Sequence, residues 1–150
     1  MTKRADSLID VTNDTGAVSD AIHRTMQSNK AKDTKPELVV RSLLREAGYP
    51  GYRLHWKKAP GKPDITYPGR KVAIFVNGCF WHRHLDCKYA YTPKTNQYFW
   101  INKFDENVER DRCNYLQLKA DGWKVFIVWE CELEIQEIEK ELARHIIEKE

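Results

Sequence analysis

The hydrophobic positions of this chain fall into segments with helical periodicity and short runs typical of strands. Between residues 35 and 47, apolar side chains recur every three or four positions, which predicts an amphipathic helix. The predicted apolar stripe consists of Leu38, Val39, Leu43, Leu44 and Ala47. Thr34 and Glu37 have the spacing of a capping box at the start of this helix, and Gly48 is a typical residue to end it.

Four shorter segments have the pattern of strands. Residues 52–56 alternate as an edge strand would, and residues 64–67 form a short strand-like segment. Residues 72–76 are apolar without interruption, which is typical of a central strand that is buried on both faces. Residues 123–129 predict a further buried strand.

The remaining periodic segments complete an α/β pattern. Residues 98–120 predict a long polar helix, residues 133–148 an amphipathic helix, and residues 18–30 a short, weakly periodic one. The stripe of the amphipathic helix contains Leu133, Ile138, Leu142 and Ile146, with Ile135 or Ile147 as a further member. We interpret residues 1–16 as a flexible N-terminal segment and residues 17–150 as a single domain. The order of elements predicts a mixed α/β fold, with helices on both sides of a central sheet.

Composition indicates the setting in which this domain works. The chain has 150 residues, of which 41% are hydrophobic and 31% charged, as in a soluble globular protein. No apolar run approaches the ~20 residues of a membrane span. No charged segment followed by an apolar one opens the chain, so we expect a cytoplasmic protein. Four cysteines in a reducing compartment favour metal binding or free thiols over disulfides.

Charge is distributed unevenly along the chain. The net charge of +3 is too small to indicate a nucleic acid partner by itself, but basic residues gather in one segment and acidic residues in residues 130–150. The clustered basic residues are Lys57, Lys58, Lys62, Arg70 and Lys71. Such a basic face suits contacts with phosphate groups, and solvated lysines on loops explain the same pattern.

Potential metal ligands gather directly after the predicted central strand. Together with one cysteine that follows the last strand, they make a complete tetrahedral set, which is typical of structural zinc. The four ligands are Cys79, His84, Cys87 and Cys131. The reverse assignment, in which His82 binds zinc and His84 is free, fits the spacing as well. Cys113 lies in a charged helical stretch, and we interpret it as a thiol of the helix surface or the core.

Three titratable residues could carry chemistry. Asp64 opens a strand after a Gly-Lys-Pro turn, a place where a nuclease can present a carboxylate to Mg²⁺, although aspartate is also common in turns. His82 lies among the metal ligands, and an imidazole with a pKa of about 6.5 can accept a proton from water at neutral pH. The capping box accounts for a glutamate at position 37, and a role of its carboxylate near a metal ion is the alternative.

Flat side chains accompany these residues. Phe80 and Trp81 follow the first cysteine directly, and Trp100 lies near the start of the long polar helix. Aromatic residues beside a polar loop usually belong to the core, but two in a row on a loop do not easily both point inward. Flat rings also suit insertion between the base pairs of DNA.

Five sequence blocks, in the same order, resemble the very short patch repair (Vsr-type) DNA mismatch endonucleases over residues 20–131. The blocks are Asp33–Glu37, Gly61–Asp64, Phe75–His82, Asn107–Arg112 and Gly122–Cys131. Within them, Gly-Cys-Phe-Trp-His and Val-Trp-Glu-Cys are the specific stretches. The resemblance implies a restriction-endonuclease-like fold, with a central mixed β-sheet flanked by helices and a structural zinc site.

The resemblance also implies an activity. Enzymes of this family nick one strand beside a thymine mispaired with guanine, the lesion left when 5-methylcytosine deaminates, and use Mg²⁺ as the catalytic cofactor. The expected partners are double-stranded DNA with a G·T mismatch, a repair polymerase and mismatch-repair proteins. We further expect a monomer that has no membrane partner and associates with the nucleoid when it acts.

Site residues follow from the matching positions. The resemblance implies that Asp64 is the central Mg²⁺ ligand and that Val76 contributes a backbone carbonyl. His82 becomes the general base, and Glu37 a supporting acidic group. The structural Zn²⁺ falls on Cys79, His84, Cys87 and Cys131. Asn77 stands where the family pattern has a histidine, and an amide cannot titrate near neutral pH.

The same resemblance implies which side chains enter the DNA. The rings would enter from the major-groove side and a methionine from the minor groove, a use that its adaptable side chain permits. These residues are Phe80, Trp81, Trp100 and Met26. Two other functions stay open at this point: a zinc-stapled module that binds distorted DNA without cutting it, and a restriction endonuclease that cuts both strands of matched duplex.

Overall fold

The computed structural model describes residues 32–149, with side chains up to residue 144. The predicted flexible segment, the predicted helix over residues 18–30 and Met26 lie outside the described residues. The described elements are α3 (Lys35–Glu46), β1 (Arg53–Leu54), β2 (Ile65–Tyr67), the 3₁₀ turn η1 (Pro68–Arg70), β3 (Val72–Asn77), α4 (Cys79–His82), α5 (Gln97–Ala120), β4 (Lys124–Trp129) and α6 (Gln136–Lys149).

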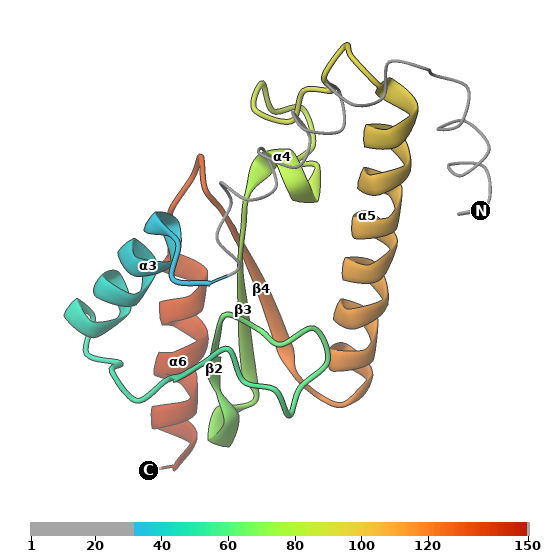
Figure 1. Cartoon of the computed structure of the whole chain (residues 1–150). Helices are drawn as coiled ribbons and strands as arrows, with labels where there is room; N and C mark the ends of the chain where they lie inside the picture. Colours follow the sequence, from blue (N-terminus) through green and yellow to red (C-terminus); the bar gives the residue numbers. More distant parts are fainter. Residues whose placement is uncertain (1–31, 150) are drawn as a thin grey trace.

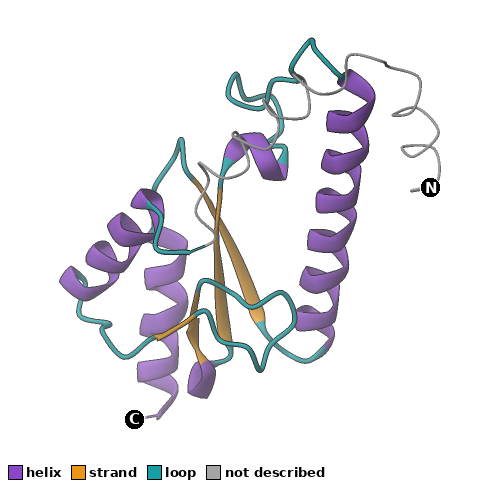
Figure 2. Ribbon diagram, in the orientation of Figure 1, coloured by secondary structure: helices purple, strands orange, loops and turns teal. Residues whose placement is uncertain are grey.

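Four strands form one mixed sheet in the order β1-β2-β3-β4 (Figure 2). The first three strands pair antiparallel, and β3 pairs with β4 in parallel. The register places Ile65 opposite Ile74 and Val76 opposite Val128. A parallel pair needs a long crossover, and α4 and α5 lie within the segment that joins β3 to β4.

Helices cover both faces of the sheet, as the sequence predicted. Figure 1 shows α3 and α6 on one side and α5 on the other. Val72, Ile74 and Val76 of β3 pack in the cluster that also contains residues of α3 and α6. Ala73 and Phe75 point to the opposite face and pack in the cluster that contains Leu118 of α5. The period of two along β3 therefore builds two hydrophobic layers from one strand, and all six residues of β3 are buried.

The helix α3 begins as predicted but buries a different side. The Thr34 side chain accepts a hydrogen bond from the backbone N–H of Glu37 at 3.4 Å, which is the predicted cap. The side that faces the sheet consists of Glu37, Val40, Arg41 and Leu44. Leu38 and Val39 are 48% and 43% exposed, so their assignment to the apolar stripe was wrong. Polar residues for the site occupy part of the inner face, which a count of apolar positions alone does not reveal.

Other boundaries also differ from the prediction. The edge strand β1 has two residues instead of five, and the segment after β3 begins with the short helix α4 where a loop was expected. The strand β4 was predicted to be buried, but it is the last strand of the sheet, and Ile127 is 38% exposed. The last helix starts at Gln136, so Leu133 and Ile135 precede it, although both still pack against the core.

Candidate active site

A large cleft opens at the end of the sheet where β3 and β4 finish. Its volume is about 1140 Å³, and it is lined from five directions by α3, the loop before β2, the end of β3, α4 and α5. Its titratable residues are Lys35, Glu37, Lys62, Asp64, His82, Tyr91, Arg110, Asp111 and Glu130. The predicted catalytic residues Asp64, His82, Glu37 and Asn77 all line this one cleft, as does Val76. The fold therefore brings them together from distant parts of the sequence.

Asp64 is held at the cleft by the neighbouring strand. Its Oδ2 accepts a hydrogen bond from the backbone N–H of Val76 at 2.7 Å. Burial raises the pKa of Asp64 to about 6, against the lowering effect of this hydrogen bond, and the nearby Glu37 carboxylate raises the pKa further. Within residues 32–149, no group donates a hydrogen bond to the other oxygen, Oδ1. A partly buried carboxylate with one free oxygen suits a divalent cation.

Residues that could hold Mg²⁺ are few but fit its chemistry. Mg²⁺ takes oxygen ligands and keeps several waters, so one or two carboxylates from the protein are enough. Asp64 supplies such an oxygen, and its hydrogen bond brings it next to the backbone of Val76. The participation of the Val76 carbonyl stays a prediction.

Glu37 serves as a cap and also lines the cleft. It is 3% exposed and accepts hydrogen bonds from the backbone N–H of Asp33 and the hydroxyl of Thr34, both at 3.1 Å. The guanidinium of Arg41 lies 3.3 Å and Nε2 of His55 3.0 Å from its Oε1. The capping interpretation is confirmed, and a supporting role near a metal stays a prediction.

His55 is a site residue that the sequence reasoning missed. Besides its contact with Glu37, its backbone N–H donates to the carbonyl oxygen of Asp64 at 3.1 Å. Its φ of 47° lies in the left-handed region, which is uncommon for a residue with a side chain. Contacts with two site residues accompany this conformation, and no local pattern in the sequence signals them.

His82 has an acidic partner. Its Nδ1 lies 2.5 Å from Oδ2 of Asp111, which comes from α5, 29 residues further along the chain. A carboxylate at Nδ1 favours the tautomer with the proton on that nitrogen, which leaves Nε2 free to accept a proton. The sequence reasoning did not connect Asp111 with His82. Its position within the Asn107–Arg112 block was the only signal in the sequence.

The four predicted zinc ligands form a compact cluster. Their ligand atoms all lie within 4.8 Å of one another. Nδ1 of His84 is 3.5 Å from Sγ of Cys79 and 3.3 Å from Sγ of Cys131, and the sulfur atoms of Cys87 and Cys131 are 3.9 Å apart. Tetrahedral ligands of zinc lie roughly 3.5–3.8 Å from one another. The arrangement therefore fits a tetrahedral metal ion, with His84 in the set and His82 outside it.

The surroundings of this cluster also suit a metal. Burial raises the pKa of the Cys79 thiol to about 12, so a cation has to displace its proton on binding. The ring of Trp129 stacks on the imidazole of His84, with a centroid distance of 4.2 Å and an interplanar angle of 11°. Glu130 accepts a hydrogen bond from the N–H of Cys79 at 3.2 Å, which joins β4 to the start of α4. Cys113 is exposed on α5, in agreement with the helix-surface interpretation.

Asn77 is engaged inside the protein. It is 4% exposed, and its side-chain amide donates to the hydroxyl of Tyr115 at 2.9 Å. Burial raises the pKa of Tyr115 to about 12, so this hydroxyl stays protonated. The amide therefore has a structural partner on α5, and a catalytic contribution by Asn77 stays a prediction.

The predicted DNA-entering rings belong to one aromatic cluster centred on Phe80. The centre of its ring lies 5.1 Å from that of Trp81, 5.4 Å from that of Trp100 and 5.1 Å from that of Phe104. Trp100 is only 4% exposed, whereas Phe80 and Trp81 are half-buried and line the cleft. The prediction that Trp100 enters the DNA does not fit this conformation, because its ring is buried behind Phe80. Insertion of Phe80 and Trp81, which line the cleft, stays a prediction.

Basic side chains lie at the same opening. Lys62 and Arg110 line the cleft, and Arg110 donates to the side-chain oxygen of Asn107 at 2.5 Å. Arg112 instead pairs with Glu109 at 3.1 Å on the exposed side of α5. Of these two arginines, Arg110 is therefore the one placed to contact a phosphate at the cleft.

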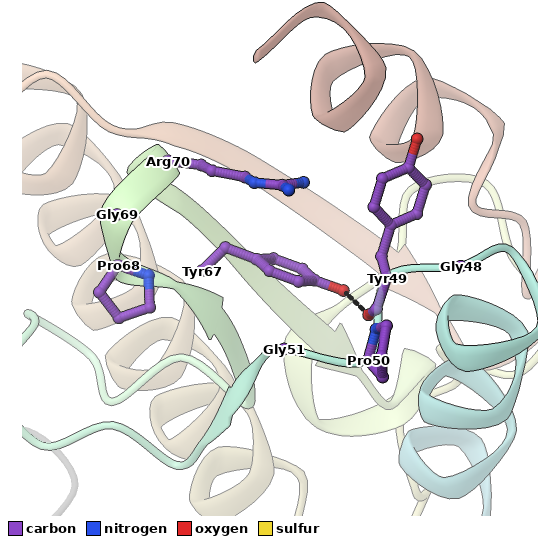
Figure 3. A pocket seen from close by; sticks show the side chains of 8 residues that line it. All are labelled: Gly48, Tyr49, Pro50, Gly51, Tyr67, Pro68, Gly69 and Arg70. Atoms are coloured by element: carbon purple, nitrogen blue, oxygen red, sulfur yellow. Dashed lines mark hydrogen bonds between the residues drawn. The ribbon is translucent and has the colours of Figure 1, made fainter. Parts of the chain in front are cut away.

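A second, smaller pocket lies away from these residues (Figure 3). Its volume is about 260 Å³, and it is lined by residues 48–51 and 67–70. The Tyr67 hydroxyl donates to the carbonyl oxygen of Tyr49 at 2.7 Å, and the Arg70 guanidinium lies 5.5 Å and 5.8 Å from the two ring centres. The predicted catalytic residues do not line this pocket. No helix in the described part of the chain is both long and apolar enough to span a bilayer.

Comparisons with known proteins agree with the geometry. Residues 19–89 match the model of the family described as "DNA mismatch endonuclease Vsr". A "Type II nicking enzyme V.XorIIP" of Xanthomonas oryzae pv. oryzae is 46% identical over 108 residues, which cover 72% of this chain and 78% of the relative. A "Type II nicking enzyme V.NmeAIP" of Neisseria meningitidis is 41% identical over 117 residues, covering 78% and 82%. The "DNA mismatch endonuclease Vsr" of Escherichia coli is 39% identical over 110 residues, covering 73% and 69%.

Proposed function

Because the chain belongs to the Vsr family and is a DNA endonuclease, we propose that it nicks one strand of duplex DNA beside the thymine of a G·T mismatch. The observation that carries this proposal is the meeting of three features in one cleft. These are the partly buried carboxylate of Asp64, the His82–Asp111 pair and the aromatic cluster. A carboxylate and a base serve hydrolysis of a phosphodiester, and flat rings serve recognition of a weakly stacked base pair.

In the proposed reaction, Nε2 of His82 accepts a proton from the attacking water. Asp111 holds the opposite nitrogen and stabilises the imidazolium that forms. The water oxygen bonds to phosphorus as the bond to the 3′ oxygen breaks, and the leaving oxygen takes a proton from solvent. The products are a 5′-phosphate and a 3′-hydroxyl. Mg²⁺ held by Asp64 and the Val76 carbonyl would neutralise the charge that develops on the phosphate.

The mismatch would be recognised through its weak stacking. Opening a base step costs a few kcal/mol, and least where the pair is already mismatched. Phe80 and Trp81 face the cleft that contains Asp64, so rings that enter the duplex hold the neighbouring phosphate near the carboxylate. Trp100 supports them from behind, and the proposal includes Met26 as the residue that enters from the minor groove.

A structural Zn²⁺ would keep α4 in place. The proposed ligands flank the helical turn that carries Phe80, Trp81 and His82. A closed tetrahedral site leaves no position for water, so this zinc would take no part in hydrolysis. We assign the whole domain to the restriction-endonuclease-like folds.

This activity would serve repair of deaminated 5-methylcytosine. The 3′-hydroxyl at the nick is the starting point for a repair polymerase, and mismatch-repair proteins are natural partners in the same process. We propose that the enzyme acts as a monomer on the chromosome in the cytoplasm, because one nick requires one active site.

A panel of short duplexes tests the proposal. Each duplex carries one mispair or none, and one strand at a time is labelled at its end. We expect nicking of the thymine strand of the G·T duplex with Mg²⁺, none without it, and none by Asp64→Asn. Cleavage of both strands of matched DNA would indicate a restriction endonuclease. Binding of the G·T duplex without any nicking would indicate a non-cutting DNA-binding module.

A further inference from the structure

Tyr91 carries the most exposed ring of the aromatic cluster around Phe80 and takes no part in the proposed reaction. Tyr91 is 61% exposed and lines the same cleft as Asp64 and His82. The centre of its ring lies 5.1 Å from that of Phe80, with an interplanar angle of 51°. Trp100 contacts Phe80 from the buried side and is 4% exposed. In this conformation, a base at the cleft reaches Tyr91 before it reaches Trp100.

The main chain around Tyr91 is anchored. The guanidinium of Arg83 donates to the carbonyl oxygens of Tyr91 at 2.9 Å, of Ala90 at 2.6 Å and of Phe80 at 3.1 Å. The same guanidinium lies 3.8 Å from the centre of the Phe104 ring. One side chain thus ties the segment that carries Tyr91 to α4 and to α5. The backbone that presents the Tyr91 ring to the cleft is therefore fixed, while the ring itself stays exposed.

We propose that Tyr91 is a DNA-contacting residue whose ring stacks on a base next to the phosphate that is cut. The proposal rests on the proposed function for the nature of the ligand, a duplex with a weakened base step. Phe80 and Trp81 form the rest of the exposed aromatic surface, and Trp100 fills the space behind it. The positive side chains of Lys62 and Arg110 at the same cleft attract the backbone of that DNA.

Exposure alone does not single out Tyr91, because other tyrosines are equally exposed. Tyr98 on α5 is 62% exposed and does not line the cleft. It is therefore a matched control: the same side chain, with the same exposure, away from the catalytic residues. The Arg83 hydrogen bonds go to the backbone of residues 90 and 91, so replacing the Tyr91 side chain leaves the anchor in place.

The test uses the full-length protein with zinc bound and a short duplex that has one G·T mismatch and 2-aminopurine beside it. Fluorescence titration without Mg²⁺ measures affinity and unstacking, and nicking is measured separately with Mg²⁺. We expect Tyr91→Ala to weaken binding roughly ten-fold or more, the size of one base–aromatic contact. Tyr91→Phe keeps the ring and should bind like the wild type, as should Tyr98→Ala. Zinc content and the thermal midpoint of every variant should match the wild type.

The outcomes separate this inference from the proposed function. If Tyr91→Ala binds the G·T duplex like the wild type, or loses no more affinity than Tyr98→Ala, the inference is overturned. The proposed function would still hold if the wild type nicks the G·T duplex. A wild type that binds but does not nick would overturn the proposed function, and the loss in Tyr91→Ala would still support the stacking contact. A wild type that does not bind the mismatched duplex would overturn both.

Discussion

The raised pKa of Asp64 predicts that this carboxylate destabilises the metal-free protein. In the folded state, burial raises the pKa from 3.8 to about 6. A carboxyl group with a raised pKa binds its proton more tightly when folded, so the free energy of unfolding falls as the pH rises through this window. The full effect of this rise corresponds to about 3 kcal/mol at neutral pH. About half of it, roughly 1.5 kcal/mol, is already present at pH 5.

The perturbation is Asp64→Asn, which keeps the shape and the oxygen that accepts from the N–H of Val76 but removes the charge. Without Mg²⁺, we expect the variant to be more stable than the wild type by about 3 kcal/mol at pH 7–8 and about 1.5 kcal/mol at pH 5. Urea unfolding at each pH, with zinc retained and no chelator, measures this difference. Added Mg²⁺ should stabilise the wild type and leave the variant unchanged.

Two results would refute this reasoning. If the difference in free energy of unfolding between the wild type and Asp64→Asn stays constant from pH 5 to pH 8, Asp64 does not titrate with a raised pKa. A wild type more stable than Asp64→Asn at pH 7 would show that the charge already has a partner in the folded protein. Asp105→Asn, which removes an exposed carboxylate of α5, is the control for the loss of a charge as such.

Three further substitutions test other parts of the site. Asp111→Asn should lower kcat for nicking by about 100-fold or more, with little change in DNA affinity, because His82 loses the group that fixes its tautomer; single-turnover assays measure this. Gly61→Ala should lower the free energy of unfolding by about 1–3 kcal/mol in urea, because φ is +78° and a Cβ would lie 3.0 Å from an α5 side chain. Cys131→Ser should lower zinc content well below one per chain and lower the unfolding midpoint.

Two of these substitutions, Gly61→Ala and Cys131→Ser, have a control in the same protein. Gly51→Ala adds a methyl group where no atom lies within 4 Å, so it should leave stability nearly unchanged. Cys113→Ser removes an exposed thiol outside the ligand cluster and should keep zinc. If Gly51→Ala lowers the free energy of unfolding as much as Gly61→Ala does, the steric explanation for Gly61 is contradicted. Full zinc binding by Cys131→Ser would contradict the proposed ligand set. A kcat for Asp111→Asn close to that of the wild type would remove Asp111 from the mechanism.

Features that depend on residue type or local pattern were predictable from the sequence. The apolar run of β3 has no polar interruption, and a strand that is buried on both faces has this pattern. The Cys/His cluster was predictable because four side chains that suit zinc follow the ends of β3 and β4. The cap of α3 depends only on Thr34 and Glu37, three residues apart. Each of these signals lies within a few residues or in the chemistry of the side chain itself.

Features that depend on tertiary neighbours were not predictable. The strand β4 is as apolar as β3, but the sheet ends beside it, so its outer edge has no strand partner in the described residues. The contact between His82 and Asp111 joins residues 29 apart, and that between His55 and Glu37 joins residues 18 apart. Neither pair has a spacing that local reasoning recognises. Only packing of the elements decides which of several polar residues meet.

The helix α5 shows why a polar pattern can still mark an inner face. Asn107, Asp111 and Tyr115 follow one another at intervals of four residues, which places them on one side of a helix. Asn107 donates to the carbonyl oxygen of Trp81, Asp111 meets His82, and Tyr115 accepts from the amide of Asn77. Asn107 and Asp111 lie at the site, and Tyr115 also packs on Phe75 in the second hydrophobic cluster, so no long hydrophobic stripe runs along this side of the helix. A single helix thereby contacts Trp81, His82 and the end of β3, and a shift of α5 would disturb all three contacts at once.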